Sequence, residues 1–179
     1  ALQVPRLLCT ANLDKVKIQF RLNGLQSVRH NGEPAFSASI PESLLRLQRR
    51  EYFRLETPQG NPILCQIRAK TENGVPIALN LPLVDISGGG VGLTVPLTAE
   101  KNFAIGTAFA GARIDLPDEG VIQVDLAVRS LSRVTMRNGN QNLRAGCEFI
   151  TLAGNRLTMI QRYITRIERE RKARLSGLE

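Results

Sequence analysis

The feature that most constrains the fold is a series of short apolar segments separated by turn residues. Residues 16–22 alternate apolar and polar side chains, which is the pattern of a half-buried β-strand. Similar segments recur along the chain, and clusters rich in Gly, Pro and Asn separate them. Many short strands at regular spacing predict a mainly β protein with an antiparallel barrel. The predicted strands are residues 16–22, 35–40, 52–56, 63–67, 77–86, 91–95, 108–116, 121–134 and 144–150.

The end of the chain changes to a helical period. Leu157, Ile160, Ile164 and Ile167 form the apolar stripe of an amphipathic helix, which would close the barrel. The opposite face carries Arg162, Arg166 and Arg169. A basic face of this kind is typical of a solvated surface, although it could also meet an acidic partner.

Two local signals concern the first fifty residues. Asn31-Gly32 predicts a tight hairpin turn. Pro41 predicts the start of a short helical turn that continues through Leu45.

Charge and composition restrict the class of partner. The formal net charge is +8 with a pI of about 10.1, so we expect an anionic ligand or surface. A β-barrel that binds nucleic acid is the alternative hypothesis, but six Phe, two Tyr and no Trp leave few side chains for stacking bases. We expect neither DNA nor RNA as the partner. No apolar run approaches the length of a membrane span, so none is expected.

The cysteines indicate the compartment. Cys9, Cys65 and Cys147 are odd in number and widely spaced, which predicts reduced thiols in a cytoplasmic protein. Cys65 and Cys147 fall within strand patterns and are predicted to be small core residues. No signal peptide is visible. The chain begins with Ala rather than Met, which is consistent with a part of a longer protein.

An unusual concentration of arginine follows the first strands. The stretch RLQRREYFRL, residues 46–55, contains Arg46, Arg49, Arg50 and Arg54 but no lysine. Planar guanidinium groups suit phosphates and the edges of bases. The stretch therefore predicts an anion-binding connection between the N-terminal strands and the rest of the chain.

A glycine-rich turn supplies complementary groups. In VDISGGGVGLTV, residues 84–95, Asp85 ends a strand, Ser87 follows, and Gly88, Gly89 and Gly90 lead into the next strand. Glycines let the backbone approach a ligand closely. Asp85 can accept hydrogen bonds from guanine N1–H and its amino group, and Ser87 can bind a phosphate or a base.

No catalytic constellation is visible. Asp115, Asp118 and Glu119 gather at a turn and are interpreted as solvated, and no nucleophile–base pair or metal-ligand spacing appears. We therefore predict a binding protein rather than an enzyme, with no metal. An RxxxR pair or a glycine turn alone would be a weak signal, but their order and spacing together favour a ligand site.

The pattern Arg50-x-x-x-Arg54, followed by Asp85-x-Ser87-x-x-Gly90, resembles the PilZ family of cyclic di-GMP receptors. The segment QRREYFR, residues 48–54, further resembles the YcgR-like flagellar brake subgroup of this family. The resemblance implies a PilZ β-barrel with a C-terminal helix over residues 47–179 and an arginine-rich linker over residues 46–54. Residues 1–45 resemble the C-terminal part of a YcgR-like split-barrel domain, but they are too few for the whole of it.

The resemblance also assigns roles to residues. It implies that Arg50 and Arg54 hold phosphates and the Hoogsteen edges of guanine. Asp85 and Ser87 would hold a guanine, and Gly90 would leave room for the base. The resemblance implies that the position of Arg49 influences whether one ligand or a stacked pair is bound. We expect two cyclic di-GMP molecules per chain with no other cofactor. Gly146, in GCEF, resembles a residue of a strand that passes near the site.

The implied function is that of a cytoplasmic cyclic di-GMP receptor that changes its domain arrangement when the ligand orders the linker. Its expected partners are flagellar motor proteins, its expected location includes the flagellar basal body, and its expected effect is to lower motility. The sequence leaves open whether the protein forms a homodimer. A degenerate barrel that kept only the fold is the third alternative, and the intact motifs count against it.

Overall fold

A computed structural model describes residues 6–13, 16–48, 50–58, 60–71, 73–136 and 139–177. The chain divides into two compact units, Ala1–Arg50 and Glu51–Glu179, which we call the N-terminal and C-terminal units. Each is described by itself.

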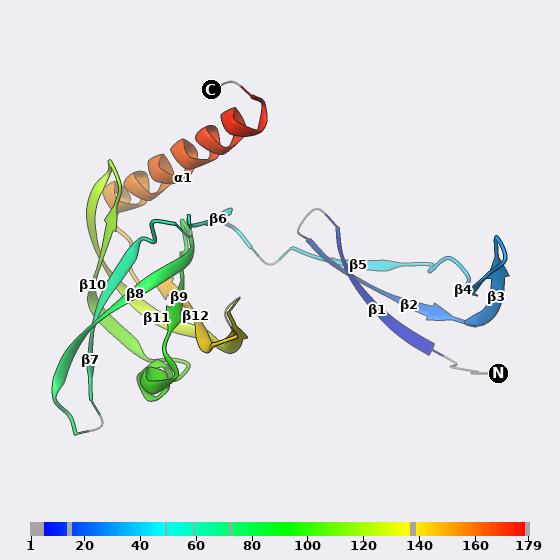
Figure 1. Ribbon diagram of the computed structural model, residues 1–179, viewed down its shortest axis with the longest axis horizontal. Helices are drawn as coiled ribbons and strands as arrows, with labels where there is room; N and C mark the ends of the chain where they lie inside the picture. Colours follow the sequence, from blue (N-terminus) through cyan, green and yellow to red (C-terminus); the bar gives the residue numbers. More distant parts are fainter. Residues whose placement is uncertain are drawn as a thin grey trace. The chain divides into compact units, whose positions relative to one another are not determined.

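The C-terminal unit is a closed antiparallel barrel of six strands (Figure 1). Around the barrel, β8 pairs with β7, then β10, β11, β12 and β9 follow, and β9 pairs with β8 to complete the closure. A further short strand, β6, pairs with the end of β8. The predicted antiparallel barrel is confirmed. The strands are β6 (Arg54–Glu56), β7 (Leu64–Lys70), β8 (Pro76–Ser87), β9 (Gly90–Val95), β10 (Ala108–Leu116), β11 (Gly120–Thr135) and β12 (Gln141–Phe149).

Apolar side chains at every second position of the strands point inward and fill the barrel. In β7, Cys65, Ile67 and Ala69 are buried while the residues between them are exposed. Burying a Leu or Ile side chain completely contributes about 1.5–3 kcal/mol, so this interior is the main source of stability. Cys65 and Cys147 belong to it, as predicted, and burial raises the pKa of each thiol to about 12.

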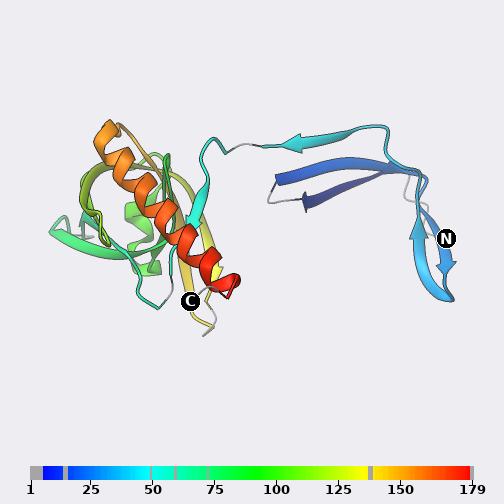
Figure 2. The same ribbon diagram turned by 90° about the horizontal axis from the view of Figure 1, so that it is seen from above.

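Helix α1 (Gly154–Leu175) follows the last strand and lies along one side of the barrel (Figure 2). Its buried residues are Ile160, Tyr163 and Ile167, so the predicted apolar stripe is confirmed, with Tyr163 added to it. Lys172 and Arg174 occupy the last turn, where cations interact favourably with the helix dipole. Among the described residues, none of the helices combines the length and apolar character needed to span a bilayer.

A 3₁₀ helix, η1 (Leu97–Phe103), was not predicted from the sequence. It connects β9 to β10 and buries Ala99 and Phe103, whose ring lies 5.0 Å from that of Phe109. The segment is too short for helical periodicity to reveal it.

The N-terminal unit contains two small sheets. One has the order β1 (Arg6–Leu13), β2 (Val16–Asn23) and β5 (Leu44–Leu47), and the other is the hairpin of β3 (Gln26–His30) and β4 (Glu33–Ser37). Asn31 and Gly32 have φ values of 51° and 84°, so the predicted tight turn with two positive φ angles is confirmed. β4 ends at Ser37, three residues earlier than predicted.

The predicted helical turn from Pro41 through Leu45 is wrong. Residues Leu44–Leu47 form β5, which pairs antiparallel with Lys17–Phe20 of β2. Strand pairing across the sheet outweighs a weak local helix signal, because it satisfies the backbone donors and acceptors of both segments. Arg46 therefore lies in β5 and Arg54 begins β6, so both ends of the arginine-rich stretch are in strands.

Candidate functional site

The tight turn between β8 and β9 brings the predicted polar residues together. The register pairs Arg54 of β6 with Ser87 of β8, and Ser87 with Gly90 of β9. Leu55 is buried in the barrel, so Arg54 and its partners lie on the outer face. The structure therefore places Arg54 directly beside the Ser-Gly-Gly-Gly turn, as the motif spacing requires.

A second row of paired residues runs beside the first. Asp85 of β8 is opposite Gly92 of β9, and Gly92 is opposite Gly146 of β12. Residues paired in this way share one face of a sheet. Two of the three positions have no side chain, and Gly92 is buried because the Asp85 carboxylate lies over it. The register therefore places this carboxylate over the backbone of β9.

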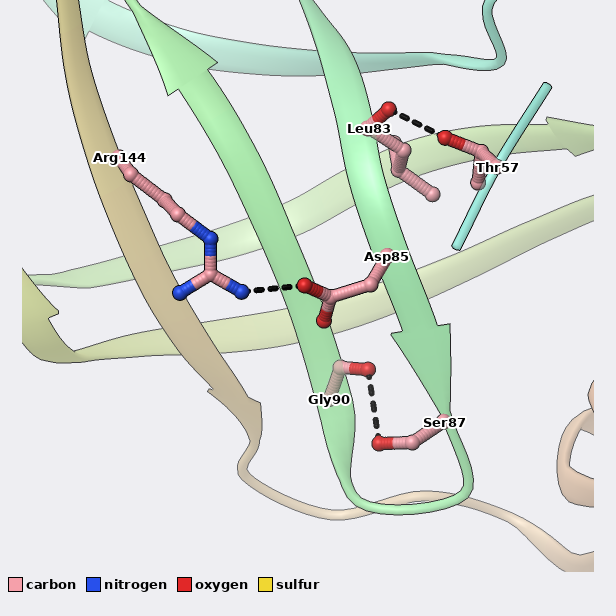
Figure 3. Close-up of polar contacts among 6 residues, drawn as sticks. All are labelled: Thr57, Leu83, Asp85, Ser87, Gly90 and Arg144. Carbon is pink, nitrogen blue, oxygen red and sulfur yellow. Dashed lines mark hydrogen bonds and ion pairs between the residues drawn. The ribbon is translucent and has the colours of Figure 1, made fainter. Parts of the chain in front are cut away.

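Ser87 makes two hydrogen bonds within the turn between β8 and β9. Its hydroxyl donates a hydrogen bond to the Gly90 carbonyl at 3.2 Å and accepts one from the Gly89 N–H at 3.3 Å (Figure 3). The residue is 5% exposed. In the described structure, Ser87 therefore fixes the shape of the turn, and one lone pair is left for an incoming donor.

Asp85 makes an ion pair that the sequence analysis missed. Its carboxylate oxygen Oδ2 accepts a hydrogen bond from Nη2 of Arg144, which lies on β12 (Figure 3). The Asp85 side chain is 10% exposed and that of Arg144 is 32% exposed. Arg144 lies 59 positions further along the chain, so no local motif joins the two.

The glycines of the turn have different structural roles. A Cβ on Gly90 would overlap the backbone carbonyl oxygen of Cys147, so close packing of β9 against β12 already requires glycine there. Gly90 therefore has a packing role, and the room for a base that the resemblance implies stays a prediction. A Cβ on Gly146 would collide with the Ser130 hydroxyl, the movable end of a side chain.

Tyr52 covers the other two glycines of the turn. A Cβ on Gly88 would lie 2.5 Å from the Tyr52 ring, and one on Gly89 would lie 3.0 Å from it. The ring therefore lies against the turn, while 44% of the residue stays exposed. Leu157 of α1 reaches the same point, 3.2 Å from the Gly88 Cβ position. An aromatic face beside a phosphate site can stack on a base, a role that the sequence analysis did not assign to Tyr52.

The remaining predicted arginines are less closely defined. Arg50 is exposed and its carbonyl accepts a hydrogen bond from Gln48 Nε2 at 3.1 Å. It belongs to the N-terminal unit, whereas Arg54 belongs to the C-terminal unit. Arg49 lies outside the described residues. The structure therefore groups Arg54, Asp85, Ser87, Gly88, Gly89, Gly90 and Gly146 at one end of the barrel, and it leaves the other two arginines as predictions.

Two other features of the described residues were considered as sites. No cluster of three His, Cys, Asp or Glu side chains suited to a metal ion occurs in the parts of the chain that the structure describes. A shallow hollow on α1 is basic, but it contains none of the motif residues. It is lined by Thr158, Gln161, Arg162, Thr165, Arg166, Arg169 and Glu170.

The contact at Gly90 leads to a stability prediction. We expect Gly90→Ala to lower the free energy of unfolding by about 1–3 kcal/mol, because overpacking against the fixed Cys147 carbonyl forces the strands apart. Urea unfolding followed by circular dichroism measures the change. Gly60→Ala is the matched control, since a Cβ there meets no atom within 4 Å. Equal effects of the two substitutions would contradict the packing role of Gly90.

Comparison with known families assigns both parts of the chain to known domains. Residues 48–166 match the PilZ domain, and residues 1–46 match the PilZN domain of the flagellar regulator YcgR. Flagellar brake protein YcgR 1 of Dechloromonas aromatica (strain RCB) is 46% identical over 173 residues, which cover 97% of this chain and 66% of the relative. Flagellar brake protein YcgR of Azoarcus sp. (strain BH72) is 44% identical over 172 residues, with 96% and 66% covered. The chain thus spans about 66% of the length of these two relatives.

Solved structures show the same fold. The crystal structure of YcgR from Escherichia coli in complex with c-di-GMP matches with a TM-score of 0.72 and 26% identity, covering 97% of this chain and 70% of that one. The MrkH–c-di-GMP complex of K. pneumonia matches with a TM-score of 0.70 and 21% identity, covering 97% and 75%, and supports the fold alone. The chain belongs to the PilZ family, with an N-terminal segment of the PilZN type found in YcgR flagellar regulators.

Proposed function

We propose that this protein is a cytoplasmic receptor for cyclic di-GMP that acts as a flagellar brake. The observation that carries the proposal is the grouping of Arg54, Asp85 and Ser87 around the turn between β8 and β9. The E. coli YcgR structure that this chain resembles was solved in complex with c-di-GMP, and the similar curated relatives are named flagellar brake proteins. Both facts support the same activity here.

Each group in the site has a defined task in this proposal. Arg54 donates charge-assisted hydrogen bonds to a ligand phosphate. Asp85 accepts hydrogen bonds from the Watson–Crick edge of a guanine. The exposed Tyr52 ring offers a stacking face. The protein binds the ligand without converting it, and it acts as a receptor rather than as an enzyme.

The position of the unit boundary supports a conformational output. The boundary falls between Arg50 and Glu51, which is inside the Arg50-x-x-x-Arg54 motif. A ligand held by both arginines would restrain the peptide that joins the two units. Restraint of a connecting segment by new charge-assisted contacts is a common form of molecular switch. The restrained form would then bind a flagellar motor protein at the basal body and lower motility.

The competing function is a barrel that binds nucleic acid. Its support is the net charge of +8 and the exposed arginines of α1. The names of the relatives do not favour it, and the basic hollow on α1 contains no aromatic residue for base stacking. The cyclic dinucleotide remains the ligand that the site suits best.

Replacing either motif arginine tests the phosphate clamp. We expect Arg50→Ala and Arg54→Ala each to remove charge-assisted hydrogen bonds of about 1.5–3 kcal/mol, which weakens binding of cyclic di-GMP roughly tenfold or more. Isothermal titration calorimetry at fixed salt measures the affinity. Arg162→Ala is the control, because it removes an equal charge from the exposed face of α1. If an arginine of the pair can be removed without loss of affinity, it does not bind the ligand.

The number of bound ligands depends on Arg49 in our proposal. Two stacked cyclic di-GMP molecules carry four phosphate groups, which a cluster of three arginines neutralises better than a pair. We expect two ligands per wild-type chain and one per Arg49→Leu chain, with Arg50 and Arg54 still engaged. The molar ratio at saturation gives the number. A ratio of one in the wild type, or of two in both proteins, would contradict the role of Arg49.

A further inference from the structure

Asp85 is a mostly buried carboxylate on the outer face of the barrel, with its side chain 10% exposed. A carboxylate in such a position is stable only with a cation or several donors beside it. Arg144 is the cation that the structure supplies. The carboxylate proposed to read guanine is therefore already held by a group of the protein.

The strand order makes this contact specific. β9 lies between β8, which carries Asp85, and β12, which carries Arg144. The two side chains meet over Gly92, where a Cβ would lie 2.8 Å from Asp85 Oδ2 and 3.1 Å from Arg144 Nη2. A side chain at this position would displace one of the two groups. Glycine at position 92 thus leaves the space that the ion pair fills. Figure 3 shows the Asp85 and Arg144 side chains pointing toward each other.

The rest of the described barrel has no equivalent pair. Arg129 and Glu148 form an ion pair across β11 and β12, but their side chains are 62% and 51% exposed. Arg133 and Glu100 are 66% and 43% exposed. Exposed pairs of this kind contribute little, because water screens both charges. The pair at Asp85 differs in burial and in its place beside the turn.

We propose, building on the proposed function, that Arg144 is a positioning residue that sets the preference of the site for guanine. Through its contact with Oδ2, Arg144 fixes the direction of the Asp85 carboxylate. A fixed carboxylate accepts from guanine N1–H and the 2-amino group. Adenine presents an unprotonated N1 and a C2–H at the same positions, so it offers no donor there to the carboxylate lone pairs that the Arg144 contact leaves free. Discrimination between purines arises because a buried acceptor is left unpaired by the wrong base.

A binding cycle tests the inference. Affinities for cyclic di-GMP and cyclic di-AMP are measured by calorimetry on the full chain, for the wild type, Arg144→Leu, Asp85→Asn and the double variant. We expect Arg144→Leu to weaken the binding of cyclic di-GMP about tenfold. The ratio of the affinity for cyclic di-GMP to that for cyclic di-AMP should fall as well. In the Asp85→Asn background, Arg144→Leu should have little further effect, because Arg144 acts through Asp85. Arg133→Leu is the control, since it removes an exposed arginine from the same barrel.

Two further measurements keep the test decisive. Thermal unfolding of each variant shows whether it folds. If Arg144→Leu does not fold, Arg144→Lys is tested in its place, because it retains the positive charge. We expect Arg144→Lys to keep the preference for cyclic di-GMP, because a single Arg144 nitrogen makes the observed contact. Equal loss in the Lys and Leu variants would overturn the positioning role.

The outcomes separate this inference from the proposed function. If the wild-type chain binds cyclic di-GMP and Arg144→Leu keeps its affinity and selectivity, the inference fails alone. If Arg144→Leu weakens binding equally with and without Asp85, Arg144 contacts the ligand directly and the positioning role is wrong. If the wild-type chain does not bind cyclic di-GMP, the proposed function fails and the inference fails with it.

Discussion

Close packing of β9 between β8 and β12 is the constraint on which the rest of the barrel depends. β9 completes the closure, and it can do so because glycines stand where its neighbours approach most closely. Gly90 faces the carbonyl of Cys147, and Gly92 leaves room for Asp85 and Arg144. The same two residues close the fold and shape the outer surface beside the turn. Barrel closure and the proposed ligand site therefore share one structural element.

Much of the fold follows from local patterns. The helical stripe from Leu157 to Ile167 and the Asn31-Gly32 turn predicted their elements correctly, because each signal depends on residues close in sequence. The segment after Pro41 was mispredicted because its state depends on pairing with β2, about twenty-five residues earlier. β1 was missed because most of its residues are exposed and show no alternation.

The candidate site could be predicted only in part. The motif spacing located Arg54, Asp85 and Ser87, which the register of β6, β8 and β9 brings to one turn. Arg144 could not be found in this way, because 59 residues separate it from Asp85 and only the barrel brings them together. Gly92 was the one sequence signal for this contact, because a glycine inside a strand often marks the close approach of another group to the backbone. Tyr52 was treated as part of a strand, whereas it covers Gly88 and Gly89.

Helix α1 contacts the site at two points. Leu157 meets the turn at Gly88, and Arg171, near the other end of the helix, donates a hydrogen bond to the Glu56 carbonyl of β6. These contacts join the helix directly to the turn and to β6 within the C-terminal unit.

Amide chemical-shift mapping of the ¹⁵N-labelled chain with cyclic di-GMP tests the central claim most directly. We expect the largest shifts on Arg54 and on residues 87–90, with smaller shifts near Arg144. Shifts confined to the arginine face of α1, or no shifts at saturating ligand, would contradict a cyclic di-GMP site at the turn between β8 and β9.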